Sequence, residues 1–216
     1  MAAPIVRYWV QSSLVLKDQR SVNKFFINQT KSKSNRMKKT TLFLALALST
    51  GALFAQKKTT TSASVNFDAT TSIDALPKAE NKTAVAALDT KTGSVAFEVV
   101  IKNFSFTNPM IQEHFNSAGW MDSDQFPTAT FKGKITDLNK VNFSKDGTYN
   151  VDVEGDLTIH GVTKATKTKA VITVNGKKIN SKSDFSIKLE DYKVEGKAIA
   201  AGKVAKEPTI SVSADF

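Results

Sequence analysis

From Ser64 to Phe216, apolar and polar side chains alternate along most of the chain. Clear runs of this pattern cover residues 95–102, 131–136, 149–160 and 209–216. Because successive side chains of a β-strand point to opposite faces of the sheet, a period of two indicates strands with one dry and one wet face. Strands of this kind are typical of antiparallel sheets. The pattern therefore predicts an all-β domain over residues 64–216.

Two dipeptides predict tight hairpins between these strands. Gly161-Val162 has glycine first, as a type II′ turn prefers, which would place Val153 opposite Ala170 and Glu154 opposite Lys169. In this register an apolar side chain lies opposite an apolar one, and an acidic side chain lies opposite a basic one, as cross-strand pairing favours.

The second hairpin is predicted at Asn175-Gly176, a pair typical of type I′ turns. A two-residue turn at this place would set Ile172 opposite Ile179.

One stretch has the pattern of a helix. Asn108 is a favoured N-cap, Pro109 suits the first helical position, and Ile111 and Phe115 lie one turn apart. We expect a short helix around residues 109–116. The other segments provide roughly eight strands, a number at which an antiparallel sheet closes into a barrel or folds into a sandwich. We predict an eight-stranded antiparallel barrel with this one helix.

The interior of an eight-stranded barrel is either filled by side chains or holds one small ligand. All the side chains that we expect to face this interior are uncharged, so a ligand held there would be apolar. They are Phe97, Val99, Ile101, Phe131, Ile135, Tyr149, Val151, Val153, Ile172, Phe185, Ile187, Ile210 and Val212. We predict that these residues form the binding site.

Residues 37–55 have the layout of a secretory signal peptide. Lys38 and Lys39 follow Met37, an apolar run comes next, and the small residues Ala52 and Ala55 end the segment. A membrane anchor is the alternative, but the uncharged stretch is only about 17 residues, short of the span of about 20 that a membrane helix needs. We therefore expect export, with cleavage after Ala55, and a bacterial periplasmic or secreted location.

Two segments flank the expected signal peptide, and residues 1–36 show no clear helical or strand periodicity. We interpret Met37 as the true start and residues 1–36 as a mis-called upstream leader, with an organelle presequence as the alternative. Residues 56–63 are expected to be a flexible linker. Residues 1–55 contain nine of the 30 Lys and Arg residues but one acid, so the net charge of +10 does not indicate nucleic-acid binding by the barrel.

The sequence offers little for catalysis. It has no Cys and two His residues, His114 and His160, so a thiolate site, a multi-histidine metal centre and a conventional serine hydrolase are all disfavoured. We interpret His160 as a turn residue. Asp122 and Asp124 are interpreted as turn residues as well, and a metal site formed by the two carboxylates is the alternative. The expectation is a protein that is not an enzyme and has no metal or cofactor.

Two stretches resemble the YceI-like family of exported, lipocalin-like barrels. The first runs over residues 110–134 and includes Phe115, Phe126-Pro127 and Phe131-Lys132-Gly133; the second covers residues 155–164. The resemblance extends from about Ser64 to Phe216. It implies an antiparallel barrel whose elongated apolar cavity binds polyisoprenoids or other long-chain amphiphiles in the bacterial periplasm or outside the cell.

Our leading hypothesis is therefore a non-enzymatic carrier or store for a polyisoprenoid or other lipid. The alternative is an exported, stress-related or surface-interaction protein whose barrel is solidly packed. A run of lysines without intervening acids follows Asp156, and we interpret it first as a solvated polar face. Lys177, Lys178 and Lys182 are the candidates for the alternative, a transient contact with an anionic membrane surface. The oligomeric state does not follow from these patterns.

Overall fold

The computed structural model describes residues 56–216. The predicted leader over residues 1–36 and signal peptide over residues 37–55 lie outside the described residues. Nine strands form one antiparallel sheet within residues 56–216, in the order β1-β9-β8-β7-β6-β5-β3-β2-β4. They are β1 Lys57–Asp68, β2 Lys78–Asp89, β3 Ser94–Val100, β4 Ser105–Phe106, β5 Thr128–Ile135, β6 Gly147–Ile159, β7 Val162–Asn175, β8 Lys178–Ser186 and β9 Thr209–Asp215.

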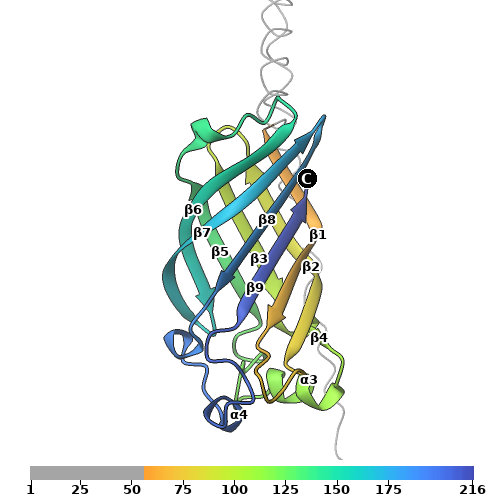
Figure 1. The fold of residues 1–216 in the computed structure, drawn as a ribbon, viewed down its shortest axis with the longest axis vertical. Helices are drawn as coiled ribbons and strands as arrows, with labels where there is room; N and C mark the ends of the chain where they lie inside the picture. Colours follow the sequence, from red (N-terminus) through yellow and green to blue (C-terminus); the bar gives the residue numbers. More distant parts are fainter. Residues whose placement is uncertain (1–55) are drawn as a thin grey trace, which may run out of the picture. The chain divides into compact units, whose positions relative to one another are not determined.

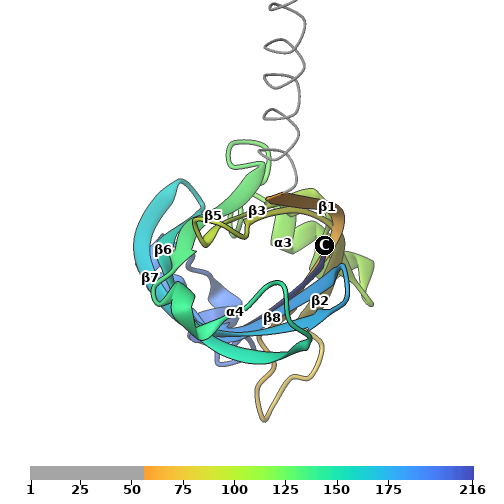
Figure 2. The same ribbon diagram turned by 90° about the horizontal axis from the view of Figure 1, so that it is seen from above.

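The sheet closes on itself because β1 pairs with both β9 and β2. Eight long strands make up the ring that Figure 2 shows end-on, and the two-residue β4 adds to the edge of β2. The strands are steeply tilted in the side view of Figure 1, as closure of a barrel requires. The predicted antiparallel barrel of eight strands is confirmed.

The first strand starts earlier than predicted. Residues 56–63 were expected to form a flexible linker, but Lys57–Asp68 is one strand whose first half pairs with the end of β2. The expectation was wrong because the first half of β1 is polar on both faces, so it shows no apolar-polar alternation that would indicate a strand. Its threonines nevertheless favour extended backbone, and pairing with β2 satisfies their backbone groups.

The turn of the β6–β7 hairpin lies one residue earlier than predicted, which displaces each cross-strand partner by two residues. Its turn is His160-Gly161, with φ values of 49° and 71°, and two positive φ values are typical of a type I′ turn. Val153 therefore lies opposite Thr168 instead of Ala170, and Glu154 lies opposite Lys167 instead of Lys169. The displacement is an even number of residues, so each side chain keeps its predicted face.

The turn of the β7–β8 hairpin is displaced in the opposite direction, one residue later than predicted. Its turn is Gly176-Lys177, so Ile172 lies opposite Ser181 instead of Ile179. The backbone N–H of Gly176 donates a hydrogen bond of 2.7 Å to the carboxylate of Asp146, on the loop before β6. This contact between distant segments fixes the turn, and the local sequence does not contain it.

The connection from β4 to β5 and the connection from β8 to β9 both lie at the end of the barrel that is lower in Figure 1. Helix α3, Pro109–Asn116, has the predicted bounds, and the side chain of its N-cap Asn108 accepts a hydrogen bond from the N–H of Met110. Residues 187–208 contain a 3-10 turn, Leu189–Tyr192, and the short helix α4, Lys197–Ala200. The prediction of a single helix missed α4, which has no apolar periodicity long enough to detect. None of the helices within residues 56–216 has the length and apolarity to cross a membrane.

Candidate functional site

An aromatic cluster forms the lower part of the barrel core. The ring of Phe115, on α3, lies with its centroid 4.9 Å from that of Phe106 and 5.9 Å from that of Phe67. Phe104 and Trp120 meet the same ring edge-on at 5.8 and 5.6 Å. Edge-to-face and tilted contacts at these distances are favourable for aromatic pairs. The apolar face of α3 therefore covers the lower end of the barrel interior.

A second, aliphatic cluster occupies the upper part. Its buried members come from five strands and the loop before β6, with Phe131 and Phe216 packed against both clusters. They are Leu88, Ile135, Val141, Val151, Val153, Ala170, Ile172, Val174 and Ile179. The barrel thus has apolar side chains along its whole interior.

Between these side chains lies an internal cavity of about 170 Å³. Its lining reaches from Phe115 and Trp120 in the aromatic cluster to Ile135 and Ile172 in the aliphatic cluster, so the cavity is elongated along the barrel. The lining is almost entirely apolar. An engineered apolar cavity of about 150 Å³ admits benzene in another protein, so this space is large enough for apolar matter.

The side chains at the cavity confirm that the interior is not solidly packed. Phe97, Phe131, Phe185 and Ile210 face inward, yet each is only half-buried. Inward-facing rings in a filled core would be as buried as Phe115, which is 3% exposed. Their exposed surface therefore faces the cavity.

Most residues predicted to face the interior line this cavity. Phe97, Val99, Ile101, Phe131, Ile135, Val153, Ile172, Phe185, Ile187, Ile210 and Val212 all do. Val151 is buried in the aliphatic cluster without bordering the cavity, and Tyr149 packs against that cluster while its hydroxyl donates a hydrogen bond of 2.8 Å to the carbonyl of Lys145. Whether any of these residues binds a ligand stays a prediction.

Several lining residues were missed by the sequence analysis. Phe67, Phe115 and Trp120 reach the cavity from β1 and from the α3 region. The aromatic pattern around α3 was a signal for Phe115 and Trp120. Leu157 continues the alternation of β6, and could have been included on that ground. Small hydroxyl residues of β7 and β8 also line the cavity, and nothing in an apolar search would find them.

The polar groups near the lower end serve the fold. The Nδ1 atom of His160 lies 3.1 Å from the carbonyl oxygen of Tyr192, and its ring packs edge-on against Phe126 at 4.5 Å. Burial raises the pKa of the Tyr192 phenol, and the neighbouring Thr166 side chain partly opposes this shift. These contacts join the β6–β7 turn to residues 187–208, and they agree with the interpretation of His160 as a turn residue.

The other candidate chemical groups do not form a reactive cluster. Asp124 pairs with Lys102 at 2.5 Å, while the backbone carbonyl of Asp122 accepts hydrogen bonds from Gln125 and Phe126 in the turn before β5. Within residues 56–216, no three His, Asp or Glu side chains lie together in a way that suits a metal ion. His114 lies exposed on α3.

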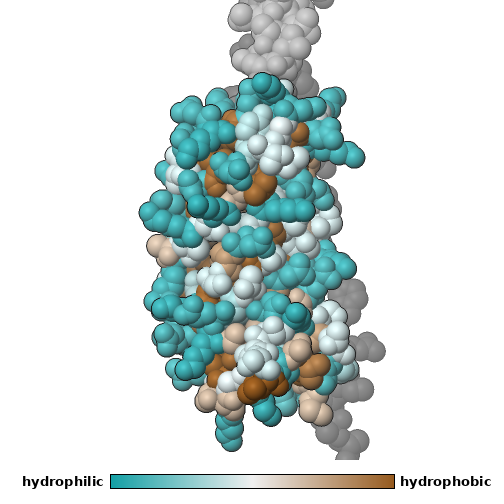
Figure 3. Space-filling view, in the orientation of Figure 1, coloured by the Kyte–Doolittle hydropathy of each residue, from teal (hydrophilic) through white to brown (hydrophobic). Residues whose placement is uncertain are grey.

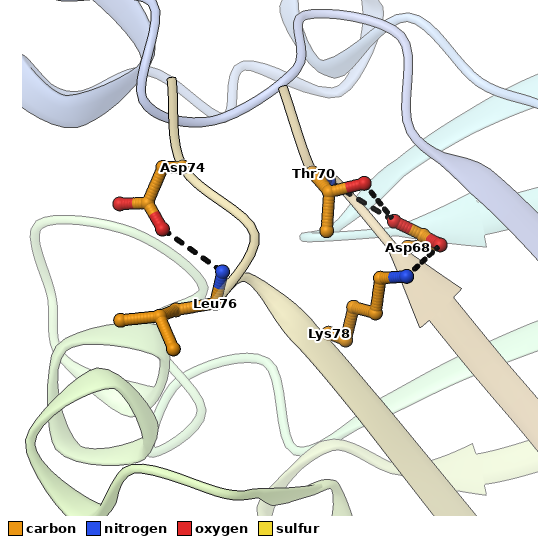
Figure 4. Close-up of polar contacts among 5 residues, drawn as sticks. All are labelled: Asp68, Thr70, Asp74, Leu76 and Lys78. Carbon is orange, nitrogen blue, oxygen red and sulfur yellow. Dashed lines mark hydrogen bonds and ion pairs between the residues drawn. The ribbon is translucent and has the colours of Figure 1, made fainter. Parts of the chain in front are cut away.

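The loop between β1 and β2 is held by its own polar contacts, shown in Figure 4. The carboxylate of Asp68 accepts hydrogen bonds from the hydroxyl and N–H of Thr70, at 2.7 and 3.1 Å, and pairs with Lys78 at 3.1 Å. Asp74 accepts a hydrogen bond of 2.9 Å from the N–H of Leu76. This network orders a loop at the lower end that exposes Ile73 and Leu76.

The outer surface contrasts with the interior. Hydrophilic residues cover most of the face shown in Figure 3. Lys177, Lys178 and Lys182 are exposed, the first at the tip of the β7–β8 hairpin and the others along β8. The side chains that alternate along each strand therefore separate a polar exterior from an apolar cavity.

Two solved structures share this architecture. BcnA of Burkholderia cenocepacia superposes with a TM-score of 0.60 at 19% identity, covering 71% of this chain and 96% of that one. A polyisoprenoid binding domain from Saccharophagus degradans gives a TM-score of 0.63 at 15% identity, covering 74% and 97%. At these identities the likeness shows the fold.

Sequence comparison adds the family. A UPF0312 protein of Pseudomonas fluorescens is 35% identical over 89 residues, which are 40% of this chain and 44% of that protein, so the match spans less than half of the relative. The YceI-like domain matches residues 54–216, which include the whole barrel. The match also includes β1 from its first residue, in agreement with the strand that the structure shows there. This chain therefore belongs to the YceI-like domain family.

Proposed function

We propose that this protein binds a long-chain apolar ligand, a polyisoprenoid or another lipid, in the cavity of its barrel, and carries or stores it. The observation that supports this most strongly is the elongated apolar cavity bordered by half-buried aromatic rings. The name of the structural neighbour from Saccharophagus degradans, a polyisoprenoid binding domain, agrees with the proposal. The residues that line the cavity are then the ligand-binding residues.

The driving force is transfer of the chain out of water. Each methylene that enters the cavity contributes about 0.8 kcal/mol, so a long chain gains affinity from its length alone. Lost freedom of the bound chain offsets part of this gain. A chain larger than the cavity enters when Phe97, Phe131 and Phe185 rotate away from its axis, because none of these rings is fully packed.

Extraction of the purified full-length protein with organic solvent, followed by mass spectrometry, tests the proposal directly. We expect a long-chain isoprenoid or acyl compound at a stoichiometry near that of the protein. A blank extract, repeated after incubation with membrane lipids, would contradict the proposal and direct attention to the outer surface.

A matched pair of variants locates the ligand. Ala129 borders the cavity and lies opposite Val99, whereas Lys132 on the same strand points outward and is exposed. Ala129→Phe fills the cavity and is expected to abolish recovery of the ligand, while Lys132→Phe leaves it unchanged. Circular dichroism and thermal unfolding check that both variants fold. Equal ligand recovery from both would place the ligand elsewhere.

Export and membrane contact complete the proposal. Members of this family are commonly exported bacterial proteins, and the signal peptide expected at residues 37–55 is consistent with a periplasmic or secreted carrier. A carrier must meet the membrane that supplies its cargo, and we propose that Lys177, Lys178 and Lys182 make this contact. Replacing all three with Gln should reduce co-sedimentation with vesicles that contain phosphatidylglycerol, and binding that is unchanged at low salt would contradict it.

No reaction is part of this function. His160 contacts Tyr192 and Phe126 and lies in a turn, so we propose a structural role for it. Ligand binding by His160→Gly should equal that of the wild type. A loss of binding would show that this residue contributes to the ligand site.

A further inference from the structure

Four hydroxyl side chains interrupt the apolar lining of the cavity on one side. We call Thr166, Thr168, Ser181 and Ser183 the hydroxyl seam; all four border the cavity from β7 and β8. Ser183 lies opposite Ala170, and Ser181 opposite Ile172, which are both buried inside the barrel. Residues directly opposite each other share a face of the sheet. The hydroxyl seam therefore points into the barrel.

The two central hydroxyls form a connected pair. The oxygens of Thr168 and Ser183 lie 2.9 Å apart. The carbonyl of Lys169 lies 2.8 Å from the Ser183 hydroxyl and 3.3 Å from the Thr168 hydroxyl. Each hydroxyl has one proton and two lone pairs. With Ser183 donating to the carbonyl and Thr168 donating to Ser183, unused lone pairs remain on both oxygens.

Ser181 adds free hydrogen-bonding capacity beside this pair. Its hydroxyl makes no hydrogen bond to any residue of the part of the chain that the structure describes, and its side chain is only half-buried. A polar group in an apolar space is costly unless it is hydrogen-bonded. The seam is therefore a place where a polar atom of the ligand gains a hydrogen-bond partner.

The charge around the seam decides which polar atom fits. Glu98 and Lys182 border the cavity, but both are exposed and lie on strand positions that alternate with the inward-facing ones. Lys164, further down β7, pairs with Asp191 at 3.7 Å and does not border the cavity. An ionised group in an apolar cavity needs a counter-charge. A neutral group is matched by hydroxyls alone.

We propose that the hydroxyl seam binds a neutral hydrogen-bonding group of the ligand, so that the ligand is a long-chain alcohol, amide or ester and not a bare hydrocarbon or an anionic lipid. The inference rests on the proposed function, because it requires a long chain in the cavity. It adds selectivity to a site whose apolar lining would by itself rank ligands by chain length.

Displacement of a fluorescent long-chain probe from the full-length protein tests the inference. The competitors share one chain length: hexadecane, hexadecanol, hexadecanamide and hexadecyl phosphate, each delivered from cyclodextrin. The alcohol and the amide are expected to displace the probe at about 10-fold lower concentration than the alkane or the phosphate, as one or two net hydrogen bonds allow.

Variants then assign the preference to the seam. Thr168→Val combined with Ser183→Ala should reduce the preference for the alcohol over the alkane to about 2-fold or less, while the affinity for the alkane is unchanged. The matched control combines Thr173→Val with Ser186→Ala, which removes exposed hydroxyls from the outer face of the same strands. If the inner double variant does not fold, Ser181→Ala is the variant to measure, because no hydrogen bond within the described residues is lost.

The outcomes separate the inference from the proposed function. Equal displacement by alkane and alcohol in the wild type, or stronger displacement by the phosphate, overturns the seam while the carrier stands. Failure of the probe to bind at all overturns the carrier. A preference for the alcohol that survives in the inner variants shows that another group recognises it, and this also overturns the inference.

Discussion

Gly133 and Gly155 lie directly opposite each other on β5 and β6, and neither position has room for a side chain. A Cβ atom added to Gly155 would overlap the Cα of Gly133 and the carbonyl of Lys132. A Cβ atom added to Gly133 would overlap the carbonyl of Glu154 and lie 2.7 Å from the ring of Phe131. The two backbones therefore come close at this point, and the ring of Phe131 lies over the glycine.

We expect Gly155→Ala to destabilise the protein by about 1–3 kcal/mol, because the backbone atoms that it meets cannot rotate away. Urea unfolding followed by circular dichroism measures this. Gly119→Ala is the control, since its added Cβ meets only the Ser117 hydroxyl, at 3.8 Å. Equal stabilities of the two variants would show that the strands separate easily at this pair.

Phe115 and Phe97 should differ in what their removal costs. Phe115 is fully buried among four aromatic rings, and Phe115→Ala is expected to cost about 3–5 kcal/mol. Phe97 borders the cavity and is half-buried, so Phe97→Ala is expected to cost less than about 2 kcal/mol. Denaturant unfolding of both variants measures the difference. Equal losses would indicate a filled interior.

Backbone strain at His160 provides a third prediction. Its φ of 49° is a conformation that glycine adopts freely and alanine does not. We expect His160→Ala to be less stable than His160→Gly by about 1 kcal/mol. Both variants lose the same ring contacts, so thermal unfolding of the pair isolates the backbone contribution. An alanine variant that is as stable as the glycine variant would contradict the type I′ turn.

Asp68 links stability to pH. Burial raises the pKa of its carboxyl, but the hydrogen bonds from Thr70 and the ion pair with Lys78 lower it by more, so the pKa lies below its ordinary value. A lowered pKa in the folded state adds stability above the unfolded pKa of about 4. That stability is lost as the pH falls through the folded value. Because the side chain is 44% exposed, the contribution is at most about 1 kcal/mol.

The measurement compares urea unfolding at pH 7 and at pH 3. Asp68→Asn should show a smaller loss of stability between the two than the wild type shows. Asp184→Asn is the control, because Asp184 is exposed and makes no ion pair within residues 56–216. A loss in Asp68→Asn equal to that of the wild type would contradict the role of this carboxyl.

Local sequence patterns were sufficient to predict features that depend on a single helix or strand. The helix at Pro109–Asn116 has its predicted bounds because the N-cap and the proline specify them. The inward face of β6 was predicted correctly although its partner was displaced by two residues, since alternation depends on the strand alone. The position of the β7–β8 turn was not, because Asp146 contacts Gly176 from another segment of the chain.

For the candidate site too, local patterns predicted some residues, and contacts between distant segments decided the others. Phe97 and Val212 were found because inward-facing positions of strands are periodic. Phe115 and Trp120 were missed because α3 folds over the end of the barrel, which no strand pattern describes. The hydroxyl seam was missed because a serine at an inward position looks like an outward one until the cross-strand partners are known.

The sequence by itself therefore determined the fold class, the inward-facing apolar set and the family resemblance, because alternation and motifs are properties of consecutive residues. Only the tertiary structure decided that the barrel closes through β1, that rings such as Phe131 leave an unfilled cavity, and that Ser181 and Ser183 face it. Closure and cavity volume depend on how side chains from many strands fill a common space. That volume is a sum over distant residues, and no local stretch of the chain contains it.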